Sequence, residues 1–581
     1  YMGAVQAIAG RGGWPMSVWL APDLKPFYGG TYFPRESRYG FPGFLDLLLR
    51  IAEAWRKQRA AVLADAGRLA EALRRSAQPA AGATLPGAQV LDEALAALRQ
   101  SFDPAWGGFG QAPKFPPFLA VDLLLRRGGA ADRTMALRTL DAMAAGGIFD
   151  HLGGGFARYS VDERWHVPHF EKMLYDNAQL ASLYLTAFQA TGQARHAQVA
   201  RACLDYLLRD MQDEGGGFHA SEDADSEGEE GRFYLFDLPQ VQAVLGDADG
   251  RLFAEAFGIG PEPGVLHRFN APSDLAARHG LTEEGLEEKL DRLRGRLREA
   301  RDLRPRPGRD DKVLASWNGL ALSAMARGCQ VLGDGRYLDG ARACAAFLER
   351  ELFRDGTLLR TWRRGVGHTA AFLEDHAAVI LGLVDLYETT FDAHCLVFAE
   401  RLAGTMRERF EDPVHGGFFS TEAGQQDLIL RQKHAFDQAL SAANALAVKA
   451  LLRLGHQLQR DDFITSAEKA LAGLAPLVEH SPRSCLGLLE GLEWILQGPL
   501  EVVVAGRWGD PYATALVDRA WSLHLARRVL AFAPEDGADP GHAGKVPIDG
   551  KPAAYVCSGR TCREPVTTPD ALSELLSARQ F

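Results

Sequence analysis

The sequence predicts a mainly helical protein built around an α/α toroid, a closed ring of helical hairpins, with a smaller α/β region on either side. Two observations lead to this fold class. From about residue 90 to residue 497, long amphipathic segments rich in Ala and Leu follow one another. Between them a loop recurs that begins with Asp and usually runs Gly-Gly-Phe into an extended segment. Such helices bury one face against their neighbours, and we expect about twelve of them.

The recurring loops and the helices between them give the order of the predicted toroid. Helices are predicted at 178–189, 194–210, 320–332, 337–352, 371–390, 395–410 and 438–454. The loops lie at 103–110, 213–220, 355–362 and 412–419, and their irregular spacing excludes a short solenoid repeat. We expect the Asp-Gly turns to close successive hairpins on one rim of the ring. A non-toroidal helical array is the structural alternative.

The N-terminal region alternates between strand and helix signals. Met16–Ala21 and Phe27–Tyr32 are rich in β-forming residues and are joined by a Pro-containing turn. A helix is predicted over Phe44–Leu73, and a Pro-, Gly- and Ala-rich linker over residues 78–89. Residue 1 is Tyr, and the first residues are typical of the end of a helix. We therefore expect the chain to be part of a longer protein.

The C-terminal region returns to an α/β pattern. Leu500–Gly506 and Arg528–Ala533 are continuous apolar strands with a helix near 512–524 between them. This order predicts a βαβ unit with parallel strands. A third strand is expected at Ala553–Cys557 and a closing helix at Pro569–Ala578.

Composition excludes several classes of protein. The net charge is −11, from 64 basic and 75 acidic residues, which argues against a nucleic-acid partner. No apolar run approaches the roughly 18 residues of a membrane span. Seven cysteines in 581 residues do not make a disulfide framework, so the reducing cytoplasm is the expected compartment. Cys557 and Cys562 fit neither a redox nor a zinc spacing and are expected to be a thiol pair without an assigned role.

Five stretches resemble the spermatogenesis-associated protein 20 family. They are Gly13–Met16 with the hairpin up to Pro34, and residues 146–181, 221–228, 310–320 and 554–562. The family pairs a thioredoxin-like domain with a six-hairpin glycosidase-like toroid. The resemblance therefore implies the C-terminal half of a thioredoxin-like domain over 1–77, the toroid over 90–497 and a small α/β domain over 498–581. It also places Pro15 where such folds carry a cis-proline, and the family's Cys motif upstream of residue 1. No redox residue is assigned in this chain.

Residues 146–181 carry the strongest candidate site. Glycines bracket Asp150 and His151 in a loop where the backbone can approach a ligand closely. Pro168 is expected to open a helix that runs to Phe188. That helix would carry polar groups on two adjacent stripes, with His169, Lys172 and Asp176 on one and Glu171 and Tyr175 on the other. The alternative is a polar network that only ties the helix start to the glycine loop.

Further polar groups gather near other helix starts and in an acidic loop. Near one helix start lie Asp311, Trp317 and Asn318, and near another lie Glu374, Asp375 and His376. The acidic loop contains Glu222 and Asp223. Trp offers a stacking surface and Asn an amide, and both are typical of sugar pockets. A buried Trp is also costly unless its indole N–H has a hydrogen-bond partner. An Asp at a helix start can instead complement the helix dipole, and the acidic loop can simply be solvated.

The predicted roles follow from the chemistry of each side chain. His169 and His376 are the expected acid/base residues, with His151 as an alternative, because the pKa of His suits proton transfer. Glu171, Asp176 and Asp375 would orient or polarise them. The expected ligand-binding residues are His151, Arg158, Tyr159, Trp165, Lys172, Tyr175, Glu222, Asp223, Asp311, Trp317 and Asn318. No cofactor is expected, and no metal either, because the His166–His169 pair lacks further ligands.

The expected function is a toroid that binds a sugar or sugar-like molecule, as a sugar isomerase or epimerase, or as a glycoside hydrolase. Glycoside hydrolysis needs two carboxylates about 5–9 Å apart, whereas isomerisation needs bases beside a carbonyl. One alternative is a toroid that binds a ligand without turnover. Another is a redox-linked or protein-interaction factor in which the toroid is a scaffold and a protein partner binds through the thioredoxin-like domain.

Overall fold

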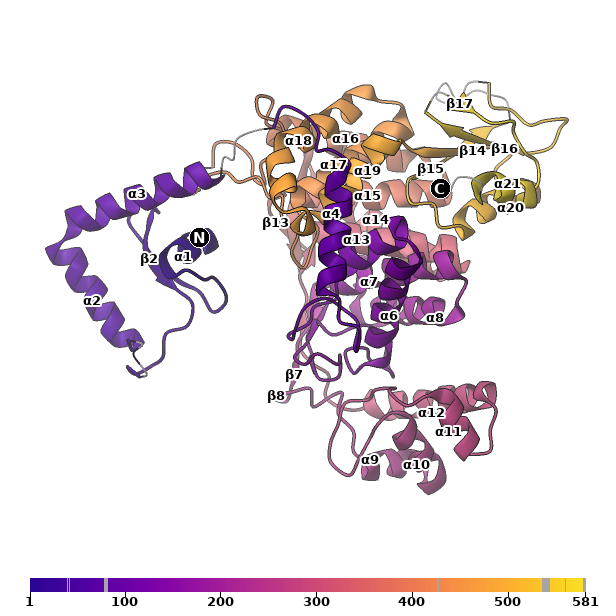
Figure 1. The fold of residues 1–581 in the computed structure, drawn as a ribbon, viewed down its shortest axis with the longest axis horizontal. Coiled ribbons are helices and arrows are strands. Elements are labelled where there is room, and N and C mark those ends of the chain that lie inside the picture. Colours follow the sequence, from indigo (N-terminus) through magenta and orange to yellow (C-terminus); the bar gives the residue numbers. More distant parts are fainter. Residues whose placement is uncertain are drawn as a thin grey trace.

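A computed structural model describes residues 1–38, 40, 42–77, 82–425, 428–535, 544–559 and 561–577. Its largest part is a double ring of helices (Figure 1). The inner helices are α5 (Phe118–Arg127), α7 (Leu174–Thr191), α13 (Ala315–Leu332), α15 (Leu373–Thr390), α17 (Ala443–Leu458) and α19 (Leu486–Gln497). Each packs on the next in this order, and α19 packs back on α5. The ring is therefore closed, and the predicted toroid is confirmed.

Six outer helices pack around the inner ring. They are α4 (Gln89–Ser101), α6 (Ala130–Ala145), α8 (Ala194–Tyr206), α14 (Gly335–Phe347), α16 (Ala393–Phe410) and α18 (Asp461–His480). The inner helices are buried along most of their length, and all but two residues of α15 are buried. The outer helices bury only one face, which explains the amphipathic pattern of the sequence.

The Gly-Gly-Phe loops are fastened to the inner helices by a repeated asparagine. The side chains of Asn177, Asn318 and Asn444 each accept a hydrogen bond from the N–H of a loop Phe and donate one to its carbonyl oxygen. The three loop residues are Phe156, Phe218 and Phe418. Each Asn lies in the first turn of an inner helix, so this device holds the loops on the rim where the inner helices begin.

An insertion interrupts the ring between α8 and α13. It contains α9 (Leu238–Leu245), α10 (Asp247–Ala256), α11 (Pro272–Arg278) and α12 (Glu283–Arg301) and has its own hydrophobic core. Figure 1 shows these helices below the ring. The sequence pattern did not distinguish them from the toroid, because their amphipathic spacing is the same.

The predicted helix from Pro168 is wrong in its first turns. Pro168–His169 is strand β4, paired with β3 (Tyr159–Ser160), and Lys172–Met173 is strand β5, paired with β6 (Ser221–Glu222). Helix α7 begins only at Leu174, so His169, Lys172 and Asp176 do not share a helix face. The cause is long-range pairing: the N–H of Arg158 also donates to the carbonyl oxygen of Glu171.

Two other helix starts differ from the predictions. Helix α13 begins at Ala315, so Trp317 and Asn318 lie in its first turn. Helix α17 begins at Ala443 rather than at residue 438, because the Asp437 carboxylate accepts hydrogen bonds from the N–H groups of Ala442 and Gly487 and folds the preceding segment into a loop.

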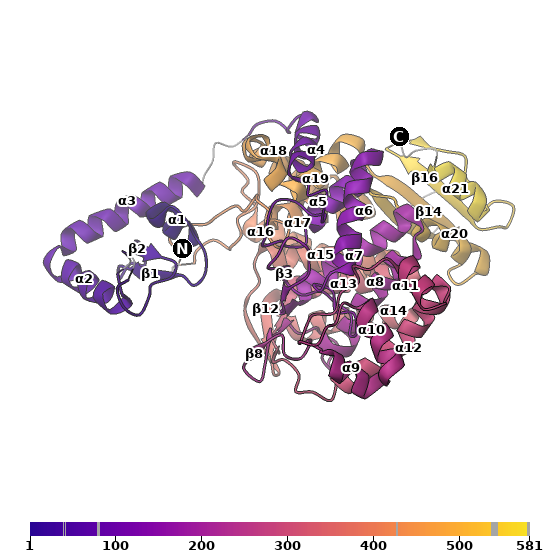
Figure 2. The same cartoon turned by 60° about the horizontal axis from the view of Figure 1, so that its bottom comes forward.

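The N-terminal part contains α1 (Met2–Ala9), the antiparallel pair β1 (Ser17–Leu20) and β2 (Pro26–Gly30), α2 (Phe44–Lys57) and α3 (Arg59–Ala77). The single predicted helix over Phe44–Leu73 is two helices, because the backbone leaves the helical region at Gln58. The Trp14–Pro15 bond is cis, as the family resemblance implied. In both ribbon views this part lies to one side of the toroid (Figures 1 and 2). Residues 78–81 of the predicted linker lie outside the described residues.

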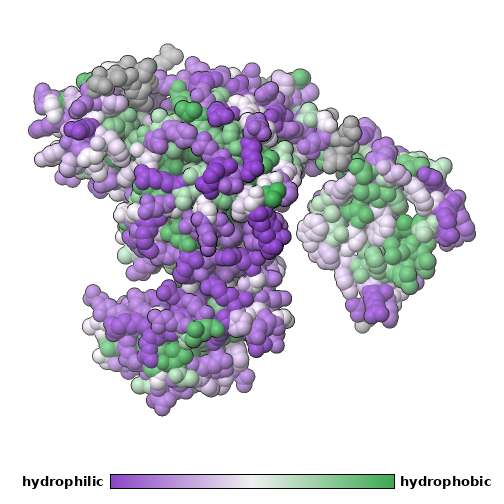
Figure 3. Space-filling view, turned by 180° about the vertical axis from the view of Figure 1, so that it is seen from behind, coloured by the Kyte–Doolittle hydropathy of each residue, from purple (hydrophilic) through white to green (hydrophobic). Residues whose placement is uncertain are grey.

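Large exposed hydrophobic side chains gather on the N-terminal part (Figure 3). Trp14 is 78% exposed, Leu45 65% and Leu49 59%. No helix in the described ranges has the length and the continuous apolar character needed to cross a membrane.

The C-terminal part is a four-stranded sheet with two helices. Its strands are ordered β15 (Arg528–Pro534), β14 (Leu500–Gly506), β16 (Ala553–Ser558) and β17 (Thr561–Cys562). The predicted parallel pairing of β14 with β15 across α20 (Pro511–Ser522) is confirmed, and β16 is antiparallel to β14. The closing helix α21 spans Pro569–Ser577, and Ala578 lies outside the described residues.

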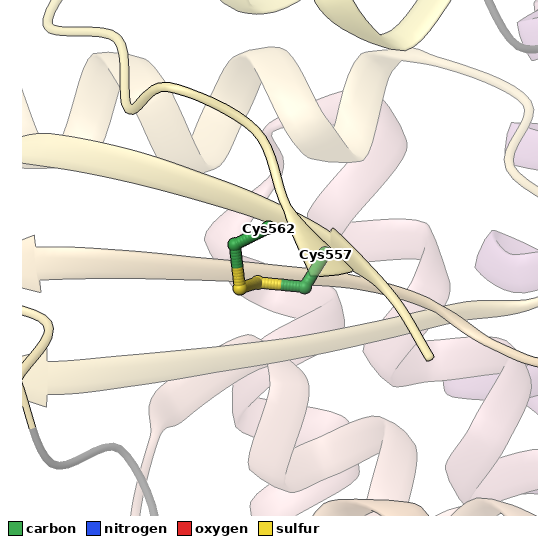
Figure 4. Close-up of a disulfide and its surroundings, with 2 residues drawn as sticks. All are labelled: Cys557 and Cys562. Atoms are coloured by element: carbon green, nitrogen blue, oxygen red, sulfur yellow. A yellow bond between two sulfur atoms is a disulfide. The ribbon is translucent and has the colours of Figure 1, made fainter. Parts of the chain in front are cut away.

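Cys557 and Cys562 form a disulfide, so the expected pair of free thiols is wrong (Figure 4). The two residues lie directly opposite each other in the β16–β17 hairpin, with Cα atoms 4.0 Å apart. The spacing of the two cysteines in the sequence gave no sign of this cross-strand register.

Candidate functional site

A cavity of about 230 Å³ lies at the centre of the toroid, and all six inner helices line it. On α7 its lining extends from Ala178 to Gln189, and on α13 from Gly319 to Gln330. The cavity therefore follows the axis of the ring from the first turns of the inner helices to their last turns. We call it the axial cavity.

The C-terminal part closes the axial cavity at the far end. Residues 523–526 and Arg528 contribute to the lining. The main anchor is Glu388 of α15, whose carbonyl oxygen accepts a hydrogen bond from the indole N–H of Trp521 at 3.1 Å. Its carboxylate lies 3.1 Å from the guanidinium of Arg528 and accepts a hydrogen bond from the N–H of Leu530. The small α/β part thus forms the floor of the cavity.

Two predicted residues, Tyr175 and Trp317, lie in the first turns of α7 and α13, at the end of the ring opposite to this floor. Their rings are in edge-to-face contact with centroids 4.8 Å apart. Tyr175 lies four residues before Gln179, and Trp317 three residues before Leu320, both of which line the cavity. Side chains at these spacings share one helix face, so the aromatic pair stands one turn outside the cavity lining, at its mouth.

Three charged residues form a cluster beside this aromatic pair. The Arg158 guanidinium lies 2.7 Å from the carboxylate of Glu171 and also interacts with the Tyr175 hydroxyl. Asp176 is 7% exposed, and its Oδ2 atom is buried without a hydrogen-bond partner. Burial, opposed by Arg158 and reinforced by Glu171, raises the pKa of Asp176 well above its usual range. The cluster therefore places a protonated carboxyl near an ion-paired carboxylate.

His169 and Tyr159 extend this cluster. Their rings stack at 5.1 Å, and His169 Nδ1 lies 2.7 Å from the Glu230 carboxylate. His169 Nε2 lies 3.7 Å from Glu171. The structure thus brings together six of the predicted site residues, which are Arg158, Tyr159, His169, Glu171, Tyr175 and Asp176.

Lys172 belongs instead to a repeated loop contact. Its ammonium group lies 2.8 Å from the buried carboxylate of Asp150 and donates a hydrogen bond to the Gly154 carbonyl oxygen. Lys114 and Lys433 make the same two kinds of contact in two other Gly-Gly-Phe loops. Burial would raise the pKa of Asp150, but Arg301 and Lys172 hold it well below its usual range. These ion pairs account for Lys172 without a ligand.

Five further predicted residues lie in packed surroundings. The His151 ring contacts the Gly146 carbonyl oxygen, and burial lowers its pKa to about 3. The His376 ring contacts the Phe372 carbonyl oxygen, and burial lowers its pKa to about 4. Trp165 is fully buried, and its indole N–H donates a hydrogen bond to the Trp106 carbonyl oxygen. Asn318 is the loop anchor described above. Asp375 caps α15 and also accepts a hydrogen bond from the N–H of Ser316. None of the five lines the axial cavity.

The remaining predicted residues form separate contacts. Glu222 is buried and accepts hydrogen bonds from the Tyr206 hydroxyl and from Arg306. Asp223 is exposed. Asp311 pairs with Arg363 and Arg364. Within the described part of the chain, no group of three or more His, Cys, Asp or Glu side chains is arranged to hold a metal ion.

Sequence reasoning missed the charged residues deep in the axial cavity. Asp122 and Arg126 on α5, Arg327 on α13, and Asp385 and Glu388 on α15 all line it. Their signal in the sequence is a charged residue in the last turns of a helix that is otherwise apolar. The predicted site was built from polar groups near helix starts and in loops, and it did not include these residues.

Comparison with known proteins identifies the family. Residues 1–74 match the family model Thioredox_DsbH, described as a protein of unknown function, DUF255. The chain is 35% identical over 634 residues to spermatogenesis-associated protein 20 of Homo sapiens, an alignment that covers 99% of this chain and 81% of that protein. The chain belongs to the spermatogenesis-associated protein 20 family. The Mus musculus member is 34% identical, with 99% and 80% of the two chains covered.

Solved structures with similarity to this chain include an unsaturated glucuronyl hydrolase and a D-mannose isomerase. An unsaturated glucuronyl hydrolase from Bacillus sp. GL1 is 14% identical, with a TM-score of 0.41 over 70% of this chain and 95% of that chain. A D-mannose isomerase is 13% identical, with a TM-score of 0.30 over 61% and 86% of the two chains.

Proposed function

We propose that the toroid of this spermatogenesis-associated protein 20 family member binds a sugar or sugar-like molecule at the mouth of the axial cavity and processes it by acid–base chemistry. The observation that carries the proposal is Asp176, a buried carboxyl with a raised pKa beside the ion-paired Glu171. A carboxyl group whose surroundings raise its pKa is the usual form of a catalytic acid at neutral pH.

Each member of the cluster has a role that its contacts support. Asp176 is protonated at neutral pH. In glycoside hydrolysis it donates its proton to the oxygen atom of the leaving group, and in isomerisation it donates its proton to the carbonyl oxygen that becomes a hydroxyl. The Glu171 carboxylate lies 2.7 Å from the Arg158 guanidinium, and it accepts a proton or stabilises positive charge. Trp317 offers the face on which a sugar ring stacks, and His169 holds Glu171 in place.

The carboxyl pair favours glycoside hydrolysis over isomerisation. Isomerisation is predicted to use His169 and His376, with His151 as an alternative, but burial lowers the pKa values of His376 and His151, and each of these two rings contacts a backbone carbonyl oxygen. Glycoside hydrolysis uses two carboxyl groups about 5–9 Å apart, one as the acid and the other as the base or nucleophile. The scaffold alternative, in which the thioredoxin-like domain is the active part, stays a prediction, and residues 1–77 contain no Cys.

The proposal is tested with Asp176→Asn and Glu171→Gln on a panel of chromogenic glycosides and reducing sugars. Hydrolysis is followed by absorbance, and hydrogen–deuterium exchange at carbon 2 by NMR. We expect the wild type to turn over at least one sugar and each variant to lose about 10²- to 10⁴-fold in kcat. Asp225→Asn, an exposed carboxylate of the neighbouring acidic loop, is the matched control and should keep wild-type activity. Wild-type rates in Asp176→Asn would refute the assignment.

A further inference from the structure

Arg327 is a basic residue of the axial cavity for which the described part of the chain supplies no carboxylate at ion-pair distance. Five basic side chains line the cavity, and only four acidic ones do. The basic residues are Arg126, Arg327, Lys449, Arg453 and Arg528, and the acidic ones are Asp122, Asp385, Glu388 and Glu490. His524 also lines the cavity, but burial lowers its pKa to about 4, so it is neutral at pH 7.

Each of the four acidic groups is paired with a basic residue other than Arg327. The ion pairs are Asp122–Arg126 at 2.6 Å, Glu490–Lys449 at 2.7 Å, Asp385–Arg453 at 2.8 Å and Glu388–Arg528 at 3.1 Å. Among the described residues, no carboxylate lies within 4.0 Å of the Arg327 guanidinium. Its one recorded hydrogen bond goes to the Thr186 hydroxyl at 2.8 Å.

An enclosed cation with so little compensation is costly. Burial of the Arg327 side chain, reinforced by Arg528 and Arg453, lowers its pKa, although Asp385 and Asp122 act in the opposite direction. A buried charge is normally paired, because desolvation is otherwise uncompensated. Part of the Arg327 side chain nevertheless remains exposed towards the cavity. Its free donors therefore face space that a ligand can enter.

Arg327 and Trp317 both lie on α13. They are ten residues apart, which corresponds to about 15 Å along the helix axis. Leu320 and Ser323 lie between them, and both line the cavity. A disaccharide or longer ligand can stack on Trp317 and reach Arg327 at once, whereas a monosaccharide can occupy either place alone.

We infer that the axial cavity takes a sugar ligand carrying a negatively charged group, and that Arg327 binds this group. The inference rests on the proposed function, since it names the class of sugar that enters the same cavity. A carboxylate and a phosphate both match the forked donors of a guanidinium, so the shared chemistry is an oxyanion attached to a sugar. Thr186 adds a hydroxyl at the same place.

The test is isothermal titration calorimetry with matched acidic and neutral sugars. The probes are D-glucuronate, D-glucose 6-phosphate and D-glucose, and cellobiouronic acid with cellobiose. We expect the wild type to bind an acidic member more tightly than its neutral counterpart. Arg327→Gln should remove this preference, with about a 10- to 100-fold loss for the acidic sugar and no change for the neutral one. Arg327→Lys should keep part of the preference, because the charge remains.

Thermal unfolding without ligand separates ligand binding from a structural role. Arg327→Gln should melt no lower than the wild type, because it removes an unpaired buried charge. Arg453→Gln in the same cavity should melt lower, because it weakens the pairing of Asp385 and Glu388. Equal destabilisation by the two variants would make Arg327 a structural residue and overturn the inference.

The outcomes distinguish this inference from the proposed function. If neutral and acidic sugars bind equally well, the inference of a negatively charged ligand is wrong, and the proposed sugar-binding function is unaffected. If no sugar in the panel binds the wild type, both are wrong. A preference for glucuronate or for glucose 6-phosphate identifies the oxyanion as a carboxylate or a phosphate.

Discussion

Asp150 and Asp176 are buried carboxyls on the same rim of the toroid, but their pKa values are shifted in opposite directions. Two cations, Arg301 and Lys172, lie 2.7 and 2.8 Å from Asp150 and keep it ionised. Among the described residues, no cation lies at ion-pair distance from Asp176, and burial raises its pKa well above the usual range. The sequence alone could not separate a loop anchor from a candidate acid, because both are Asp residues near glycines and helix starts.

The opposite shifts predict opposite pH dependences of stability. Asp150→Asn should lower the free energy of unfolding at pH 7 by about 3–5 kcal/mol, because two buried cations lose their partner. The folded-state pKa of Asp150 lies below the unfolded value of 3.8, so this loss should shrink as the pH falls below about 4. Urea unfolding followed by circular dichroism at pH 7 and pH 3 measures it.

Asp176→Asn should behave in the reverse sense in the same measurement. The folded wild type holds a proton that the unfolded chain releases above its pKa of 3.8, so wild-type stability falls as the pH rises. The variant lacks this penalty and should be at least as stable as the wild type at pH 7, with the difference vanishing at acid pH. A clear loss of stability at pH 7 would contradict the assigned protonation state.

At the scale of elements, the rim is organised by the contact between each Gly-Gly-Phe loop and an Asn in the first turn of an inner helix. Gly154 in one such loop has a φ of 77°, and a Cβ there would lie 2.2 Å from the Ala202 carbonyl oxygen. The backbone of this loop is therefore confined to one path. The Asn side chain supplies the donor and the acceptor that the buried Phe backbone needs.

Removing this Asn should destabilise the toroid. Asn177→Ala leaves both backbone groups of Phe156 buried without a partner, and we expect a loss of about 1–3 kcal/mol in the free energy of unfolding. Asn318→Ala and Asn444→Ala should behave alike. Asn270→Ala, which removes one exposed hydrogen bond to Glu255, is the control and should change stability by less than about 0.5 kcal/mol. Indistinguishable effects for Asn177 and Asn270 would refute the anchoring role.

The elements also show which features the sequence could predict. Long helices such as α15 and the parallel pair β14–β15 are encoded in local patterns and were predicted within a few residues. The strands at 168–173 and the register that joins Cys557 to Cys562 depend on partners elsewhere in the fold, which no local pattern shows. The same reason hid Arg327, whose meaning depends on which carboxylates other helices bring into the cavity.

At the scale of the whole molecule, the ring and the C-terminal part together make one enclosed site. The inner helices form the walls, and the segment 523–528 forms the floor through Glu388, Trp521 and Arg528. Tyr175 and Trp317 lie in the first turns of α7 and α13, at the opposite end of the ring.

The central claim is that a sugar enters this ring at Trp317. The most direct test is saturation-transfer NMR with the full chain and the same neutral and acidic sugars, comparing the wild type with Trp317→Leu, which keeps apolar volume without the ring. We predict transfer to at least one sugar in the wild type and its loss in a variant with an unchanged melting temperature. The absence of transfer to any sugar, or equal transfer in the wild type and the folded variant, would contradict the account.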